Sequence, residues 1–262
     1  MTQLARALVV WAALTSSTTA LTSSTPALTR RHALRSLGVG VATSAATASS
    51  ASAAAAPPLA GVDALKSELR DLLAAPTPPP IAASDARAGA IDAALDRLCA
   101  LNPTPRPGSA EAFMPVAPGR WRVAFAPHIA KLSGLAGTRF DPILYNLARD
   151  GSIVSNVRYS TLGGFKGWLS TSGSFGSRDD ATSFVEWDDA WWQPGDAEAP
   201  GGPDEGFAAP VVSALGRLGF VNAFANFPVR YLDADLCVFV FPLSNTRIVA
   251  VREGGALGSI WG

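Results

Sequence analysis

The stretch Gly119-Arg120-Trp121-Arg122-Val123-Ala124-Phe125 decides the fold class of this chain. Within it, Trp121, Val123 and Phe125 alternate with residues that are charged or small. A period of two residues is typical of a strand that buries one face. Upstream of this stretch the apolar residues instead recur every three or four positions, which is the helical period. The chain therefore changes here from helix to sheet.

Short segments of the same kind follow on the C-terminal side. They are rich in β-branched and aromatic residues and are separated by turn residues: Ile153–Tyr159, Trp168–Leu169, Phe184–Trp187, Leu236–Phe241 and Ile248–Arg252. The last two, with Pro242 to Thr246 between them, predict a closing hairpin. Residues 194–206 predict a polar surface loop, whereas Val211 to Phe220 is ambiguous and could form a short helix. Short strands at this spacing favour an antiparallel barrel.

Two amphipathic helices are expected before the sheet. The first has its apolar residues at Val62, Leu65, Leu69, Leu72 and Leu73, and Pro76 to Pro80 forms a stiff linker after it. Ser84-Asp85 predicts the cap of the second helix, whose apolar face is Ile91, Ala94, Leu95, Leu98 and Leu101. The expected fold is α+β, mainly β: an antiparallel β-barrel preceded by two N-terminal helices.

The charge distribution divides the chain into two parts. Residues 1–62 contain four arginines and no Asp, Glu or Lys, so residues 63–262 hold 17 of the 21 basic groups and all 21 acidic groups. We interpret residues 1–60 as a targeting leader and residues 61–262 as the folded domain. A net-acidic domain argues against nucleic acid as a partner, because phosphates are neutralised by clustered Lys and Arg.

The leader combines the features of three targeting signals. Arg6 and the apolar residues 7–14 resemble a secretory signal, and the hydroxyl-rich, acid-free residues 15–29 suit a plastid transit segment. Arg30-Arg31, followed by the mildly apolar residues 37–46 and Ala51-Ser52-Ala53, has the parts of a twin-arginine export signal. This order predicts a chloroplast protein of the thylakoid, with the lumen favoured over the stroma. The alternative is one long transit peptide in which the arginine pair is incidental.

Residues that could carry catalysis or bind a metal are scarce. The chain has two cysteines and two histidines, and of the histidines only His128 lies in the folded domain. Cys99 and Cys237 are expected to be buried thiols, which could pair if the protein is luminal. No nucleophile elbow and no calcium-loop spacing occurs in the sequence. The sequence thus predicts no metal and no cofactor.

Three segments, in their order and spacing, resemble a known family. They are Leu98 to Pro107, which contains Asn102-Pro103-Thr104-Pro105, then Gly119 to Phe125, and finally Tyr231-Leu232-Asp233-Ala234-Asp235. Over roughly residues 62–252 the chain resembles the plastid lipid-associated protein (fibrillin) family. The resemblance implies a lipocalin-like barrel that associates with thylakoid membranes or plastoglobules. It also implies an apolar ligand such as a carotenoid, a quinone or another lipid.

Aromatic residues in or beside the expected strands are the candidates for a ligand-binding site. A barrel of about eight strands leaves an interior just wide enough for one small ligand. The expected ligand-binding residues are Trp121, Val123, Phe125, Tyr145, Trp168, Phe184 and Trp187. The alternative is that these side chains simply fill the barrel. Trp191 and Trp192, just before the polar loop, are expected instead to contact a membrane or a partner.

The motif residues are expected to be structural. Asn102 can close the second helix in a left-handed conformation, with Pro103, Thr104 and Pro105 directing its exit, and Gly119 opens the strand. In the segment from Tyr231 and Leu232, Asp233 should bond backbone amides, and Arg247 could pair with Asp233 or Asp235.

The expected function is therefore non-enzymatic binding or organisation of apolar molecules in the plastid. One alternative is a lipocalin-type enzyme that uses Asp233 and Asp235 as acid–base groups on a plastid isoprenoid. The other is a structural or interaction protein of the thylakoid, which would use Trp191, Trp192 and the 194–206 loop.

Overall fold

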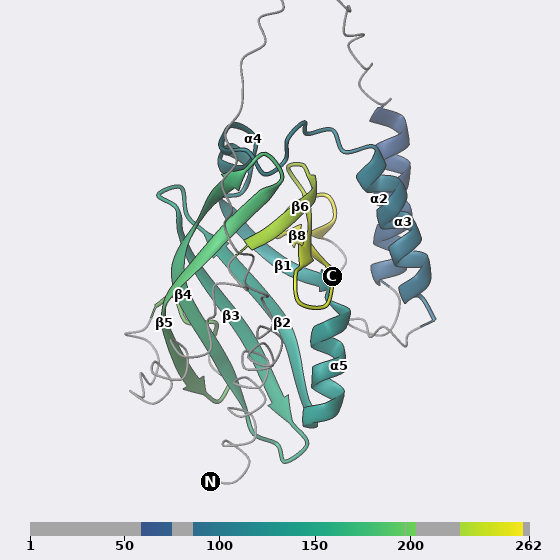
Figure 1. The fold of residues 1–262 in the computed structure, drawn as a ribbon. Helices are drawn as coiled ribbons and strands as arrows, with labels where there is room; N and C mark the ends of the chain where they lie inside the picture. The colour runs from purple at the N-terminus through teal and green to yellow at the C-terminus, as the bar shows by residue number, and fades with distance from the viewer. Residues whose placement is uncertain (1–58, 75–85, 197, 203–225, 259–262) are drawn as a thin grey trace, which may run out of the picture.

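The strands of this protein close into an antiparallel barrel (Figure 1). The computed structural model describes residues 59–74, 86–196, 198–202 and 226–258. The helices are α2 (Leu59–Ala74), α3 (Ala88–Ala100), α4 (Ala110–Val116) and α5 (Pro127–Ala136). The strands are β1 (Gly119–Phe125), β2 (Thr138–Leu147), β3 (Ser152–Thr161), β4 (Lys166–Asp179), β5 (Thr182–Pro194), β6 (Asn226–Leu232), β7 (Leu236–Phe241) and β8 (Thr246–Arg252).

Each strand is hydrogen-bonded to the next one in the chain, and β1 closes the barrel by pairing with β8. Trp121 lies opposite Arg252 of β8 on one side and opposite Tyr145 of β2 on the other. The seam between β5 and β6 is short, because only Thr182 to Phe184 pair with β6. The predicted α+β, mainly β barrel is confirmed, and β7 and β8 form the expected closing hairpin.

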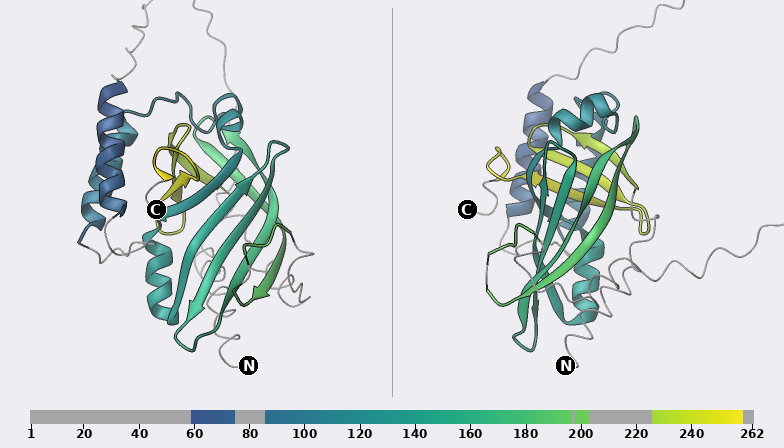
Figure 2. Two further views of the ribbon diagram at one scale, coloured as in Figure 1. Left: turned by 180° about the vertical axis from the view of Figure 1, so that it is seen from behind. Right: turned by 90° about the vertical axis from the view of Figure 1, so that its left-hand side faces the viewer.

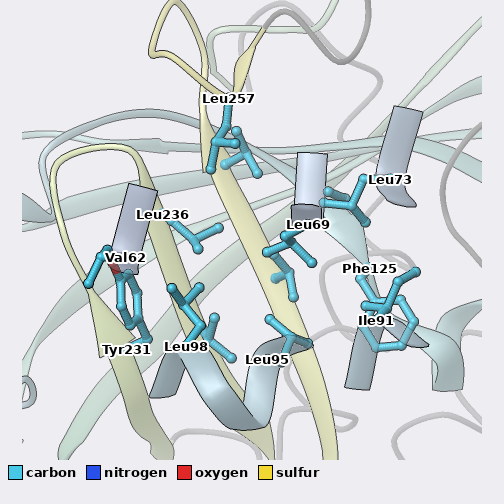
Figure 3. Packing of buried hydrophobic residues seen from close by; sticks show 14 of the residues in the cluster. Val62, Leu69, Leu73, Ile91, Leu95, Leu98, Phe125, Tyr231, Leu236 and Leu257 are labelled. Atoms are coloured by element: carbon cyan, nitrogen blue, oxygen red, sulfur yellow. The ribbon is translucent and has the colours of Figure 1, made fainter. Parts of the chain in front are cut away.

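The two N-terminal helices pack side by side against the outside of the barrel (Figures 1 and 2). The predicted apolar faces of both are the faces that are buried. Leu69 and Leu73 of α2 and Ile91, Leu95 and Leu98 of α3 have no exposed surface. They meet Phe125, Tyr231 and Leu236 from the outer side of the sheet (Figure 3). One apolar core therefore lies between helices and sheet, outside the barrel.

Two bulges change which residues point into the barrel. In β1, Val123 pairs with Ala250 and Phe125 with Val249, so Ala124 is an extra residue. In β6 the register shifts in the same way between Val229 and Tyr231. A one-residue shift moves every following side chain to the other face of a sheet. Phe125 and Tyr231 consequently point outward, toward α2 and α3, rather than into the interior.

Two further helices, α4 and α5, form in segments where the sequence did not predict a helix. Ser109 caps α4, since its hydroxyl accepts a hydrogen bond from the amide of Ala112 at 3.3 Å. Helix α5 has Pro127 in its first turn, where the fixed φ of proline suits a helix, and it ends at Gly137 with φ 57°. α4 lies at one end of the barrel, and α5 runs alongside β2 (Figure 1).

Several predictions concern residues outside the described ones: the leader up to residue 58, the Ser84-Asp85 cap, and the ambiguous Val211 to Phe220 segment. In the described ranges, no helix is both long enough and apolar enough to cross a membrane.

A candidate binding site inside the barrel

The interior of the barrel is hollow at the end where α4 lies. The cavity has a volume of about 90 Å³. The empty space is about 680 Å³ when the open, solvent-filled mouth of the cavity is included. Its walls are largely apolar, and half of the lining residues are aromatic. They come from all eight strands and from α4 with the residue that follows it: Phe113, Ala117, Trp121, Tyr145, Leu147, Ile153, Phe175, Ser183, Phe184, Val185, Trp187, Phe227, Leu232, Cys237, Phe239 and Ala250. None of these side chains carries a charge.

Strand register explains why these residues meet. Residues that lie directly opposite each other on paired strands share a face of the sheet. Trp121 opposes Tyr145. In the next inward row Leu147 opposes Ile153, Ile153 opposes Gly173, and Gly173 opposes Trp187. At Gly173 the backbone of β5 comes so close that an added Cβ would lie 1.9 Å from the carbonyl oxygen of Glu186. A glycine is required there, because the backbone of β5 occupies the space that a side chain would take.

The other end of the barrel is filled. Val123, Ile143 and Ile248 form a compact cluster there with Phe241 and with Ile129 of α5. The imidazole of His128 stacks on Phe241 with ring centroids 4.4 Å apart and lies 2.9 Å from the hydroxyl of Thr246. Burial lowers the pKa of His128 to about 4. The interior is thus solid beside α5 and open beside α4.

Contacts of Trp121 and Arg252 hold α4 against the barrel. The indole of Trp121 donates a hydrogen bond to the carbonyl oxygen of Ala117 at 2.8 Å. The guanidinium of Arg252 lies over the Trp121 ring at 4.2 Å and donates to the carbonyl oxygen of Pro118 at 2.8 Å. The ring of Trp121 is therefore fixed as a wall of the cavity.

The polar groups in the wall are few and neutral. The hydroxyl of Ser183 donates to the carbonyl oxygen of Phe227 at 3.3 Å. Burial raises the pKa of Tyr145 to about 12 and that of the Cys237 thiol to about 12, so both stay protonated at neutral pH. Cys99 lies in the outer core and Cys237 in the inner one, and both are free thiols. The possible pair of cysteines is therefore not formed.

Four of the seven predicted ligand-binding residues line the cavity: Trp121, Tyr145, Phe184 and Trp187. The prediction was wrong for the other three. Val123 points inward but belongs to the filled end, and the bulge in β1 turns Phe125 outward. Trp168 lies one residue out of phase with the inward positions of β4, and the guanidinium of Arg158 lies over its ring at 5.3 Å.

The prediction that Trp191 and Trp192 contact a membrane or a partner is contradicted by burial for Trp191 and stays a prediction for Trp192. β5 continues to Pro194, so both residues are in a strand paired with β4 instead of in a loop. Trp191 has no exposed surface. Trp192 is half-buried, and its indole donates a hydrogen bond to the hydroxyl of Tyr159 at 2.6 Å.

Two of the three motif segments touch each other. The side-chain oxygen of Asn102 accepts hydrogen bonds from the amides of Thr104 and Leu232, at 3.2 and 3.3 Å. The hydroxyl of Thr104 donates to the carbonyl oxygen of Leu232. These bonds fit the expected structural role, but Asn102 is not left-handed, since the described non-glycine residues with positive φ are Arg106 and Asn245. Asn102 acts through its side chain, not through its backbone conformation.

Asp233 and Asp235 form an ion-paired cluster with Lys66 of α2, outside the cavity. The Lys66 ammonium lies 2.9 Å from Asp233 and 3.0 Å from Asp235. As predicted, Asp233 accepts hydrogen bonds from two backbone amides, those of Asp235 and Leu236. Burial acts to raise the pKa of Asp233, but hydrogen bonds from Tyr231, Asp235 and Lys66 outweigh it, so the pKa is lowered.

The expected pairing of Arg247 with one of these carboxylates was wrong. Arg247 instead bonds Asp92 and Asp96 of α3. The helices on the outside of the barrel supply both the partner of the acidic turn and the partners of this arginine. Neither helix had been expected to reach these residues, because the sequence does not show on which part of the sheet the helices dock.

Much of the cavity wall had no clear signal in the amino-acid sequence. Phe113 lies in α4 and Ala117 caps its C-terminus; the short length of this helix hides its periodicity, although Ser109 followed by Glu111 is a recognisable start. Phe175 lies in a Gly- and Ser-rich stretch that resembles a turn. Phe239 and Cys237 lie in a continuous apolar run, where alternation cannot show which residues face inward.

The described residues contain no group of three or more His, Cys, Asp or Glu side chains that could hold a metal ion. A scan of protein-family models and a search of curated proteins each returned no match to this chain.

Proposed function

We propose that this protein binds an apolar small molecule or lipid inside its barrel without transforming it chemically. The observation that carries the proposal is the cavity beside α4, whose walls are aromatic rings and aliphatic side chains with no charge among them. Moving apolar surface of a ligand out of water contributes about 25 cal/mol per Å², before the cost of ordering the ligand. Flat, rigid rings such as those of Trp121 and Trp187 suit isoprenoid or acyl chains.

The size of the cavity limits what it encloses. An apolar cavity of about 150 Å³ takes up a molecule the size of benzene. A volume of about 90 Å³ therefore encloses a ring or a short length of chain, and the rest of a longer ligand lies in the space toward the opening. For a carotenoid, a quinone or another lipid, this means that one end of the molecule is held inside the barrel.

The alternative of a lipocalin-type enzyme has less support. It assigns acid–base roles to Asp233 and Asp235, but both carboxylates are paired with Lys66 on the side of the sheet that faces α2. The thiol of Cys237 and the phenol of Tyr145 face the cavity, and burial raises the pKa of each to about 12. A buried, protonated thiol is a weak nucleophile.

We further propose that the chain is a plastid lipid-associated protein, located at the thylakoid or at plastoglobules. The contact between Asn102 and Leu232 supports the resemblance, because it joins two of the segments on which the resemblance rests. The composition of residues 1–60 supports the plastid. A fusion of residues 1–60 to a fluorescent protein should accumulate in plastids, and accumulation in the cytosol would contradict this proposal.

Extraction with organic solvent tests the binding function. The protein, purified from the membranes or particles with which it associates, should release one pigment, quinone or lipid in a stoichiometric amount. The Ala250→Leu variant, which fills part of the cavity, should release less of it, whereas Ala124→Leu, a matched change in the outer core, should not. Repeatedly empty extracts of the wild-type protein would contradict the proposal.

A further inference from the structure

One row of inward-facing residues at the cavity carries hydroxyl groups on three adjacent strands. Trp121 opposes Tyr145, Tyr145 opposes Ser155, and Ser155 opposes Thr171. Because opposed residues share a face, all of them point inward with Trp121 and Tyr145, which line the cavity. The row therefore places the hydroxyls of Ser155 and Thr171, which do not themselves line the cavity, on the two strands next to the Tyr145 phenol, which does.

The hydroxyl of Tyr145 has no hydrogen-bond partner among the described residues. In contrast, the hydroxyl of Tyr159, also on the inner face of β3, accepts a hydrogen bond from the indole of Trp192 at 2.6 Å. Polar groups taken out of water are normally hydrogen-bonded, because leaving one unpaired costs free energy. Tyr145 is half-buried, and its hydroxyl is not among the fully buried side-chain atoms that lack a partner. The phenol is therefore accessible from the cavity and is placed to bond whatever fills it.

We propose that the ligand is a neutral molecule with an apolar body and a carbonyl or hydroxyl oxygen at one end, and that this oxygen is bound by Tyr145 with Ser155 and Thr171 beside it. This inference rests on the proposed binding function and makes its ligand class more specific. The apolar body lies among Phe113, Phe175 and Trp187.

A neutral head group follows from the charges around the cavity. No lysine, arginine or histidine lines it. Arg252 opposes Trp121 at the end of the same row, but its guanidinium donates to the carbonyl oxygens of Val116, Pro118 and Ala234. A carboxylate buried there would have no counter-ion, which is a costly arrangement in an apolar site. The site therefore selects against fatty acids in their ionised form and in favour of alcohols, ketones and quinone-type rings.

Equilibrium dialysis of the full chain at pH 7 against three probes of one shape tests this inference. The probes are 4-butylphenol, 4-butyltoluene and 4-butylbenzoate, which differ only in bearing a hydroxyl, a methyl or a carboxylate group. We expect 4-butylphenol to bind most tightly and 4-butylbenzoate at least tenfold more weakly. Tyr145→Phe should weaken binding of 4-butylphenol about tenfold, which corresponds to one lost hydrogen bond, and should leave 4-butyltoluene within twofold.

Tyr159→Phe is the matched control, because it removes an inner-face phenol that is already bonded to Trp192, and it should change none of the affinities. Ser155→Ala and Thr171→Val should each weaken 4-butylphenol by a smaller factor. If 4-butylphenol and 4-butyltoluene bind equally and Tyr145→Phe alters neither, the inference is wrong while the proposed function stands. Tightest binding of 4-butylbenzoate overturns the neutral head group. Absence of binding by all three probes overturns the inference and counts against the proposed function as well.

Discussion

Replacing Ala250 with leucine tests whether the barrel is hollow. Ala250 is 2% exposed, lines the cavity, and lies between Val123 of β1 and Cys237 of β7. The substitution adds three carbon atoms to the inner face of β8. At about 0.8 kcal/mol for each buried carbon group, the gain is about 2.4 kcal/mol. Loss of leucine rotamer freedom costs about 0.5–1 kcal/mol, so the free energy of unfolding should rise by about 1.5 kcal/mol.

The sign of the change carries the test. A cavity of about 90 Å³ accepts the three carbon atoms, whereas in a filled interior the same change overpacks the core and costs about 1–3 kcal/mol. Urea unfolding of the ligand-free protein, followed by tryptophan fluorescence, measures the difference. The midpoint should move to higher urea at an unchanged slope, which indicates a change in stability alone.

Ala124→Leu is the control for this experiment. Ala124 has no exposed surface and lies in the outer core between the sheet and the helices, and it does not line the cavity. The same three carbon atoms should therefore lower the free energy of unfolding by about 1–3 kcal/mol. If both variants are destabilised to a similar extent, the interior beside α4 is solid and the reasoning from the cavity fails.

Three further predictions concern the outer core, the filled end and β5. Lys66→Met should lower the free energy of unfolding, measured in urea, by about 2 kcal/mol, because it leaves two largely buried carboxylates unpaired. Arg97→Met removes an exposed ion pair and should lower the same free energy by less than about 0.5 kcal/mol. Since the pKa of His128 is lowered to about 4 in the fold from 6.5, its contribution to stability is complete above pH 6.5 and is lost as the pH falls toward 4, by up to about 3 kcal/mol. His128→Phe should lack that part of the pH dependence, and identical profiles for the two proteins would contradict the assignment. Trp191→Ala should destabilise the protein by about 3–5 kcal/mol and leave the flotation of its folded fraction with lipid vesicles unchanged; a selective loss of flotation would restore the membrane-contact hypothesis.

The predictions from sequence succeeded where structure is local and failed where register matters. Leu69, Leu95 and Leu98 were placed correctly on buried helix faces, because helical periodicity marks a face without reference to the rest of the chain. Trp121 was placed correctly for the same reason on β1. Phe125, only four residues further, was misplaced because a bulge reverses the alternation, and no residue type at Ala124 announces one.

The candidate site was recovered only in part for a similar reason. Tyr145 and Trp187 were identified as aromatic residues of strands, but Phe239 lies in an apolar run whose inner and outer residues look alike in the sequence. Trp191 and Trp192 were placed just before a loop instead of inside β5, because the end of β5 depends on its pairing with β4. Pairing partners distant in sequence decide such boundaries, and local composition does not reveal them.

Periodicity and turn residues alone thus established an α+β chain with two amphipathic helices and a barrel of short antiparallel strands. They could do so because each helix or strand carries its own apolar face. The position of the cavity depended on the assembled barrel, in which bulges, the closure of β1 on β8 and the docking of α4 choose which faces meet. These choices arise from contacts between residues far apart in the chain, and a cavity is the space that such contacts leave unfilled.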